Sequence, residues 1–228
     1  MAHPQGNFFC RNLANATSIL GVAPLVILFL DDGYRYLIPL IVFNNFMDDL
    51  DGILAAKLNI KSRFGSDLDN ICDAVAHVVL ALAAGAHFGG LIMGASVVAA
   101  GSIILRVTAR VDPHTAAGTG SPTNELMRHI LLVLLLAGQF DFEPATILIA
   151  VFLLHSGSML VPFAMPALIR SRAKSTLLIG LVNVALVAAW LLPPVTPVVA
   201  AAFMGTYCYA LAAGIVGWSK QRGGGTAP

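Results

Sequence analysis

Long apolar runs separated by short polar segments fill almost the whole chain. A membrane-spanning helix needs about 20 mostly apolar residues, and the runs of this chain approach or exceed that length. The pattern predicts an all-α integral membrane protein with about eight transmembrane helices in one bundle, and the bounds are good to a few residues. The predicted helices are residues 16–31, 35–57, 65–86, 89–110, 124–140, 144–167, 174–193 and 195–218.

The composition agrees with this pattern. Hydrophobic residues make up 57% of the 228 residues and charged residues only 11%, whereas about a quarter of the residues of a soluble domain are charged. The net charge of +1 gives no reason to expect a nucleic-acid partner. Every predicted loop is short, so we expect a single transmembrane domain over residues 1–220, followed by a disordered glycine-rich tail over residues 221–228.

Basic residues gather on one side of the predicted membrane. If the N-terminus lies in the cytoplasm, that side receives all of the 13 basic residues except Arg35. Cytoplasmic loops carry an excess of lysine and arginine, so we expect a multi-pass protein of the cell inner membrane with both termini in the cytoplasm. The residues on the cytoplasmic side are Arg11, Lys57, Lys61, Arg63, Arg106, Arg110, Arg128, Arg170, Arg172, Lys174, Lys220 and Arg222.

Half of the 12 acidic residues lie between positions 48 and 73. Asp48 and Asp51 share one face at the cytoplasmic end of the second predicted helix, and Asp69 and Asp73 share one face at the start of the third. The connecting loop is short, so the two helices should be antiparallel neighbours. Four carboxylates can then face one another across the helix pair.

Four carboxylates that converge at a membrane surface indicate a metal site. Oxygen-rich sites suit Mg²⁺ or Mn²⁺, and four carboxylates suffice for two ions. A charge near a transmembrane helix centre costs roughly 2.5–3.5 kcal/mol on insertion scales, so acids in helical register within a span indicate function. Asp49 and Asp67 point away from the shared faces, and we interpret both as acids at the membrane surface.

The same residues resemble a family signature, D-x2-D-G-x2-A-R-x8-G-x3-D-x3-D, of the CDP-alcohol phosphatidyltransferases. Every spacing is kept, and one fixed position differs: Ala56 stands where the family has an arginine. In the family that arginine is expected to contact the nucleotide's phosphates. The matching residues here are Asp48, Asp51, Gly52, Ala55, Gly65, Asp69 and Asp73.

The resemblance implies a transferase of substituted phosphate groups that uses Mg²⁺ or Mn²⁺, with two ions expected. Such an enzyme moves a phosphatidyl group from CDP-diacylglycerol to a small polar alcohol and releases CMP. By resemblance, Asp48, Asp51 and Asp69 are the core metal ligands. Asp73 is either a ligand of the second metal or the general base, and we favour the base. The family also implies a homodimer in the lipid bilayer.

The resemblance also implies where the nucleotide binds. Gly52 and Gly65, which lack side chains, would let the cytidine nucleotide lie close against the helices, with Ala55 beside it. The charge missing at Ala56 would come from a neighbouring base; the alternatives are weaker phosphate binding or loss of activity. The candidate bases are Lys57, Lys61 and Arg63.

The acceptor alcohol is less well defined than the donor. The segments "TGSPTNE" and "SGSMLVPF" look most like the phosphatidylserine synthase branch, which favours L-serine; choline, glycerol phosphate, inositol and inositol phosphate remain alternatives. An anionic acceptor needs a cation in the cytoplasmic half of the bundle, and Arg106, Arg110 and Arg128 are the candidates. Long basic side chains also anchor helices at the interface.

A membrane carrier of divalent metal ions is the alternative from another class of protein. Such a carrier should hold further acids deep in several helices. In this chain the acids of the spans lie at one end of one helix pair, which favours the enzyme.

Overall fold

The structure is a computed structural model that describes residues 8–112, 122–161, 163, 165 and 176–223. Within these residues the chain folds into eight α-helices and short 3-10 segments, with no strand. The predicted all-α fold is therefore confirmed. The helices are α1 (Phe8–Val22), α2 (Leu37–Lys57), α3 (Arg63–Phe88), α4 (Gly90–Val111), α5 (Pro122–Phe140), α6 (Ala145–Leu160), α8 (Thr176–Leu191) and α9 (Thr196–Gly223).

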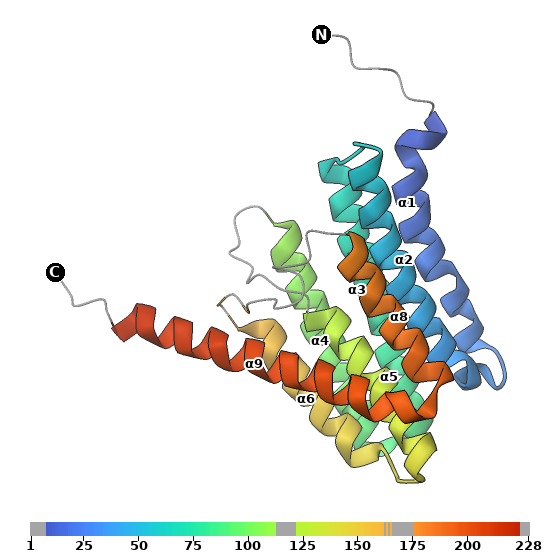
Figure 1. Cartoon of the computed structure of the whole chain (residues 1–228), viewed down its shortest axis with the longest axis vertical. Helices are drawn as coiled ribbons and strands as arrows, with labels where there is room; N and C mark the ends of the chain where they lie inside the picture. Colours follow the sequence, from blue (N-terminus) through green and yellow to red (C-terminus); the bar gives the residue numbers. More distant parts are fainter. Residues whose placement is uncertain (1–7, 113–121, 162, 164, 166–175, 224–228) are drawn as a thin grey trace.

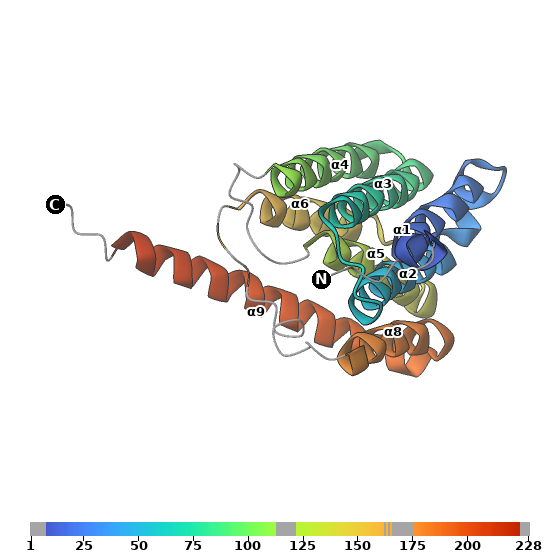
Figure 2. The same ribbon diagram turned by 90° about the horizontal axis from the view of Figure 1, so that it is seen from above.

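Helix α5 forms the centre of the bundle. It contacts α2, α3, α6, α8 and α9, and most of its side chains are buried. Around it, α1 packs on α2 and α3, α3 packs on α4, and α4 packs on α6. Helices α8 and α9 lie against the α2 and α5 side, and α9 runs steeply across the other helices, so that its C-terminal half leaves the bundle (Figures 1 and 2).

Local sequence signals set the ends of α3. The hydroxyl of Ser62 caps its start by accepting a hydrogen bond from the backbone N–H of Gly65 at 3.0 Å, as serine favours at this position. Its end is set by Gly89, whose φ of +66° lies in the left-handed region that glycine adopts without steric cost. Gly89 and Gly90, both with positive φ, therefore turn the chain from α3 into α4.

Small residues allow α3 and α4 to pack closely. A Cβ atom at Gly85 of α3 would lie 2.0 Å from the Oγ atom of Ser96 of α4, so no larger side chain fits without moving a helix. Ala84 and Ala99 are fully buried on these two helices. The close contact fixes α3, which carries two of the acids of the signature, against the rest of the bundle.

The lengths of the helices agree with a membrane protein. In the described part of the chain, four segments are long and apolar enough to cross a membrane, and two shorter apolar helices accompany them. Helices α2 and α5 are interrupted by polar residues, but several of these, such as Asn124 and Arg128, are buried inside the protein, where intramembrane polar groups are normally found. The four segments are Asn12–Phe29, Arg63–Phe88, Gly90–Val111 and Pro193–Arg222.

The predicted helix positions agree with the observed ones to within a few residues, except at the two chain-terminal helices and the end of the sixth, where differences are larger. Eight crossings of a membrane and the cytoplasmic position of both termini stay predictions. The basic residues Arg170, Arg172 and Lys174 lie outside the described residues, as does the predicted tail from residue 224 onward.

Candidate active site

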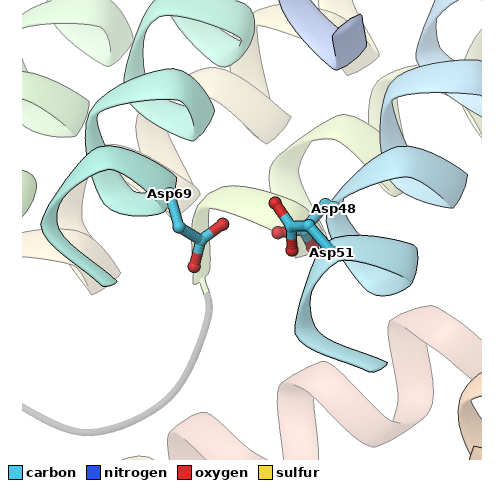
Figure 3. Close-up of side chains that lie close together, drawn as sticks. All are labelled: Asp48, Asp51 and Asp69. Carbon is cyan, nitrogen blue, oxygen red and sulfur yellow. The ribbon is translucent and has the colours of Figure 1, made fainter. Parts of the chain in front are cut away.

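Three carboxylates from two helices converge where α2 ends and α3 begins, which we call the acidic end of the bundle. Asp48 and Asp51 of α2 point toward Asp69 of α3 (Figure 3). One oxygen atom from each carboxylate lies within 4.8 Å of the other two. The structure thus brings together three of the four acids that the helical spacing placed on facing surfaces.

Asp73 lies one turn deeper on α3. Its carboxyl group contacts that of Asp48, and the charges of Asp51 and Asp69 also act on it. The fourth acid is therefore next to the cluster of three, on the side that leads into the bundle. We call Asp48, Asp51, Asp69 and Asp73 the carboxylate group.

The chemistry of this group fits a divalent cation. Like charges so close together repel one another, and each disfavours the ionised form of its neighbours. Mg²⁺ and Mn²⁺ prefer oxygen ligands, and carboxylates from two helices can supply several of them. The residues that would hold such ions are Asp48, Asp51 and Asp69, with Asp73 within reach of a second.

Two polar side chains from other helices contact these acids. Ser18 of α1 donates a hydrogen bond to Oδ2 of Asp51, and Asn124 of α5 donates one from Nδ2 to Oδ2 of Asp48 at 2.6 Å. Neither residue was predicted as part of the site. The partners are 33 and 76 residues apart in the sequence, so no local spacing connects them.

A pocket of about 330 Å³ opens beside the carboxylate group. Asn15 and Ser18 of α1 also border it. A Cβ atom at Gly52 would meet no atom within 4 Å, so the missing side chain leaves open space. At Gly65 a Cβ atom would lie only 3.1 Å from Oδ1 of Asn15. The signature residues and the base that line the pocket are Asp51, Gly52, Ala55, Gly65, Asp69 and Lys61.

The three candidate bases near Ala56 differ in their positions. Lys61 lines the pocket. Lys57 and Arg63 are exposed and do not line this pocket, and Nε of Arg63 lies 3.7 Å from a carboxylate oxygen of Asp67. Asp67 is partly exposed, and its position at a membrane surface stays a prediction. Of the three bases, Lys61 is thus the one that borders the pocket beside the carboxylate group.

Two of the candidate arginines lie on α4. Arg106 is 5% exposed, and its Nη1 donates to the backbone oxygen of Met159 at 3.5 Å. Arg110 lies one turn closer to the end of α4, near enough to Asp69 for its charge to act on that carboxylate. Arg110 is thus the member of the pair that lies close to the carboxylate group.

Arg128 belongs to a buried set of hydrogen-bonded polar side chains that also includes Asp49. Its Nη1 contacts Oε1 of Glu125 at 2.6 Å, and its Nε donates to Oδ1 of Asn45 at 2.9 Å. Asn45 donates to Oδ1 of Asn183 at 2.9 Å, and Asn183 donates to Oδ2 of Asp49 at 2.7 Å. We call Asp49, Asn183, Asn45 and Arg128 the amide network.

The interpretation of Asp49 as a surface acid was wrong. The residue is only 8% exposed, because α8 packs on the face of α2 that carries it. Asn183 of α8 supplies the hydrogen bond that a buried carboxylate requires. The residue that contacts Asp49 lies 134 positions later, so the pattern around Asp49 gave no sign of it.

Comparison with known proteins agrees with this geometry. The fold and the carboxylate group define a helical membrane protein with an acidic, metal-compatible site at one end of its bundle. A family model described as CDP-alcohol phosphatidyltransferase matches residues 11–156, which is more than half of the chain. The chain therefore belongs to the CDP-alcohol phosphatidyltransferase family. No protein in a search of curated proteins matches it.

Membership confirms the resemblance found in the sequence at the level of the family. The family transfers substituted phosphate groups from CDP-alcohols in membranes and uses divalent metal ions. The matched part runs from α1 to α6 and includes every residue of the carboxylate group. Helices α8 and α9, with Asn183, lie beyond it.

Proposed function

We propose that this protein transfers a phosphatidyl group from CDP-diacylglycerol to a small polar alcohol, with L-serine as the favoured acceptor and CMP as the leaving group. One observation carries the proposal: facing carboxylates of α2 and α3, in the spacing of the family signature, border a pocket of about 330 Å³. The site would face the cytoplasm from the inner membrane, in a homodimer.

In this proposal Asp48, Asp51 and Asp69 hold Mg²⁺ or Mn²⁺. A divalent cation bound there would neutralise the diphosphate of the CDP-lipid and stabilise the oxygen atom that leaves with CMP. Asp73 serves as the general base and accepts the proton of the acceptor hydroxyl. The hydroxyl oxygen then forms a bond to the phosphorus of the phosphatidyl group as the bond to CMP breaks.

The pocket would hold the nucleotide. Gly52 leaves room for a ring or a phosphate beside α2, and Ala55 adds only a methyl group one turn later. Lys61 is the base that we expect to replace the family's arginine at Ala56. An ammonium group provides charge without the planar fork of a guanidinium group, so we expect Lys61 to attract the phosphates rather than to fix their orientation.

A cation near the base would select an acceptor that carries an anionic group. Arg110 is the candidate whose charge acts on Asp69 of the carboxylate group. Arg106, one turn deeper, could line the same approach. Arg128 already has Glu125 as an ionic partner, so a role in binding the acceptor would require that pair to rearrange.

The acceptor is tested with purified protein in detergent. The protein is incubated with CDP-diacylglycerol, Mn²⁺ and, in separate reactions, serine, choline, glycerol 3-phosphate, inositol and inositol phosphate, and the lipid product is identified by mass. We expect phosphatidylserine and an equal amount of CMP. Another product would change the acceptor and keep the reaction. Divalent-ion flux into proteoliposomes with no transfer to any alcohol would instead support the metal carrier.

A further inference from the structure

Helix α5 contacts the carboxylate group through one side chain that the family signature does not contain. Asn124, in the first turn of α5, is 3% exposed. Its Nδ2 donates to Oδ2 of Asp48 at 2.6 Å, while its Oδ1 accepts a hydrogen bond from Thr123 at 3.2 Å. Because Nδ2 can only donate, the amide occupies an acceptor position of Oδ2 and limits rotation of the Asp48 carboxylate.

A second contact one turn further along keeps Asn124 in this position. Arg128 lies four residues after Asn124 on α5, and Asn45 lies three residues before Asp48 on α2. Nε of Arg128 donates to Oδ1 of Asn45 at 2.9 Å. The two antiparallel helices are therefore joined at two successive turns, which fixes both the height and the rotation of α5 relative to α2.

We propose that Asn124 is a positioning residue that orients Asp48 toward Asp51 and Asp69 and thereby raises the affinity of the site for its divalent cation. The inference rests on the proposed function, in which Asp48 is a metal ligand. Hydrogen-bond partners of ligating carboxylates fix the orientation of those ligands, and their removal typically weakens metal binding about 10–100-fold. Asn124 satisfies the geometric requirement for such a partner.

The test measures metal binding and does not depend on catalysis. Mn²⁺ is titrated into wild-type protein and the Asn124→Leu variant in detergent without any lipid substrate, and unbound Mn²⁺ is measured by electron paramagnetic resonance. Leucine keeps the branching of asparagine at Cγ and removes the donor. We expect the dissociation constant to rise at least tenfold. The transfer rate, where measured, should recover as Mn²⁺ is raised to saturation.

Asn70→Leu is the matched control. Asn70 follows Asp69 on α3, and its Nδ2 donates to the backbone oxygen of Ser66 in the same helix at 2.8 Å. This variant should bind Mn²⁺ within twofold of wild type. If Asn124→Leu does not fold, Asn124→Ala is the second variant, because it removes the donor without introducing a branched side chain.

Two results separate this inference from the proposed function. A folded Asn124 variant that binds Mn²⁺ within twofold of wild type overturns the inference, even if its melting temperature falls, because only packing would then be affected. A wild-type protein that binds Mn²⁺ but transfers no phosphatidyl group overturns the proposed function. In that case the expected loss of Mn²⁺ affinity in Asn124→Leu would still support the inference.

Discussion

The acids on the two sides of α2 have different partners. On the side that faces α3, Asp48 and Asp51 meet a third carboxylate, that of Asp69. On the side that faces α8, Asp49 meets the amide of Asn183. The hydrogen bond stabilises the buried Asp49 carboxylate, whereas the clustered acids repel one another and would be stabilised by a bound cation. One side of the helix therefore serves stability, and the chemistry of the other fits a cation.

The largest expected effect comes from the clustered side. Asp69→Asn should reduce CMP release on the order of 10²–10³-fold, because a group that stabilises charge in the transition state is lost. Its melting temperature in EDTA should not fall, because one of several repelling charges is removed. CMP release and thermal unfolding of the purified variant provide both measurements.

Asp67→Asn is the control for this variant, since Asp67 lies two residues away at the surface of the same helix and should keep wild-type activity. Full activity in Asp69→Asn would show that the side of α2 that faces α3 is not the catalytic side.

Adding and removing metal should separate the two sides of α2 through thermal stability. A ligand present at 100 times its dissociation constant stabilises a folded protein by about 2.7 kcal/mol. Mn²⁺ should therefore raise the melting temperature of wild-type protein and of an Asp49→Asn variant alike, and EDTA should reverse the shift. The same titration should leave Asp69→Asn nearly unchanged. An equal shift in Asp69→Asn would mean that the cation binds elsewhere.

The opposite outcome is expected on the α8 side. Asn183→Leu leaves a buried carboxylate at Asp49 without this donor, and such a loss costs about 1–3 kcal/mol of unfolding free energy. CMP release per folded molecule should stay near the wild-type value. Denaturation midpoints and activity at a temperature well below the transition measure these two quantities.

The double variant Asp49→Leu with Asn183→Leu should recover part of that stability, because removing both partners leaves no unsatisfied acid. Reduced activity with unchanged stability in Asn183→Leu would show that the two sides of α2 do not divide their roles as proposed.

The smallest effect concerns the cation beside the clustered side. Lys61→Ala should raise the KM for the CDP-lipid by at most about fivefold, because an exposed lysine contributes up to roughly 1 kcal/mol to an ionic contact. Lys57→Ala is the matched control and should change KM less than twofold. Adding Ala56→Arg to Lys61→Ala should restore the lower KM. Equal effects of Lys57→Ala and Lys61→Ala would argue against a specific role for Lys61.

The sequence predicted the clustered side of α2 well because local periodicity determines it. Asp48 and Asp51 are three residues apart, and Asp69 lies in the first two turns of the next helix after a short loop, so their common direction follows from helix geometry. The α8 side could not be predicted in this way. Asp49 differs from Asp48 only by one position, and its burial depends on a helix that comes more than a hundred residues later.

The same limit applies to Asn124 and Ser18. Both residues are ordinary polar residues at the start or middle of a helix, and their roles depend on how α1 and α5 pack against α2. These partners are determined by tertiary packing, and no residue spacing in a single sequence indicates them. The acids that they contact, Asp48 and Asp51, could by contrast be assigned to the site because both belong to the family signature.

The hydrogen bond between Asn183 and Asp49 also has a consequence for which substitutions this protein can accumulate. The family match ends at residue 156, yet the helix that carries two carboxylates of the site depends on a side chain in α8 for the stability of its other face. The stability of the part of the chain that the family model matches thus depends on a side chain outside it. We expect loss of the donor at position 183 to be tolerated best when position 49 changes in a compatible way, which would couple the C-terminal helices to the site through the stability of α2.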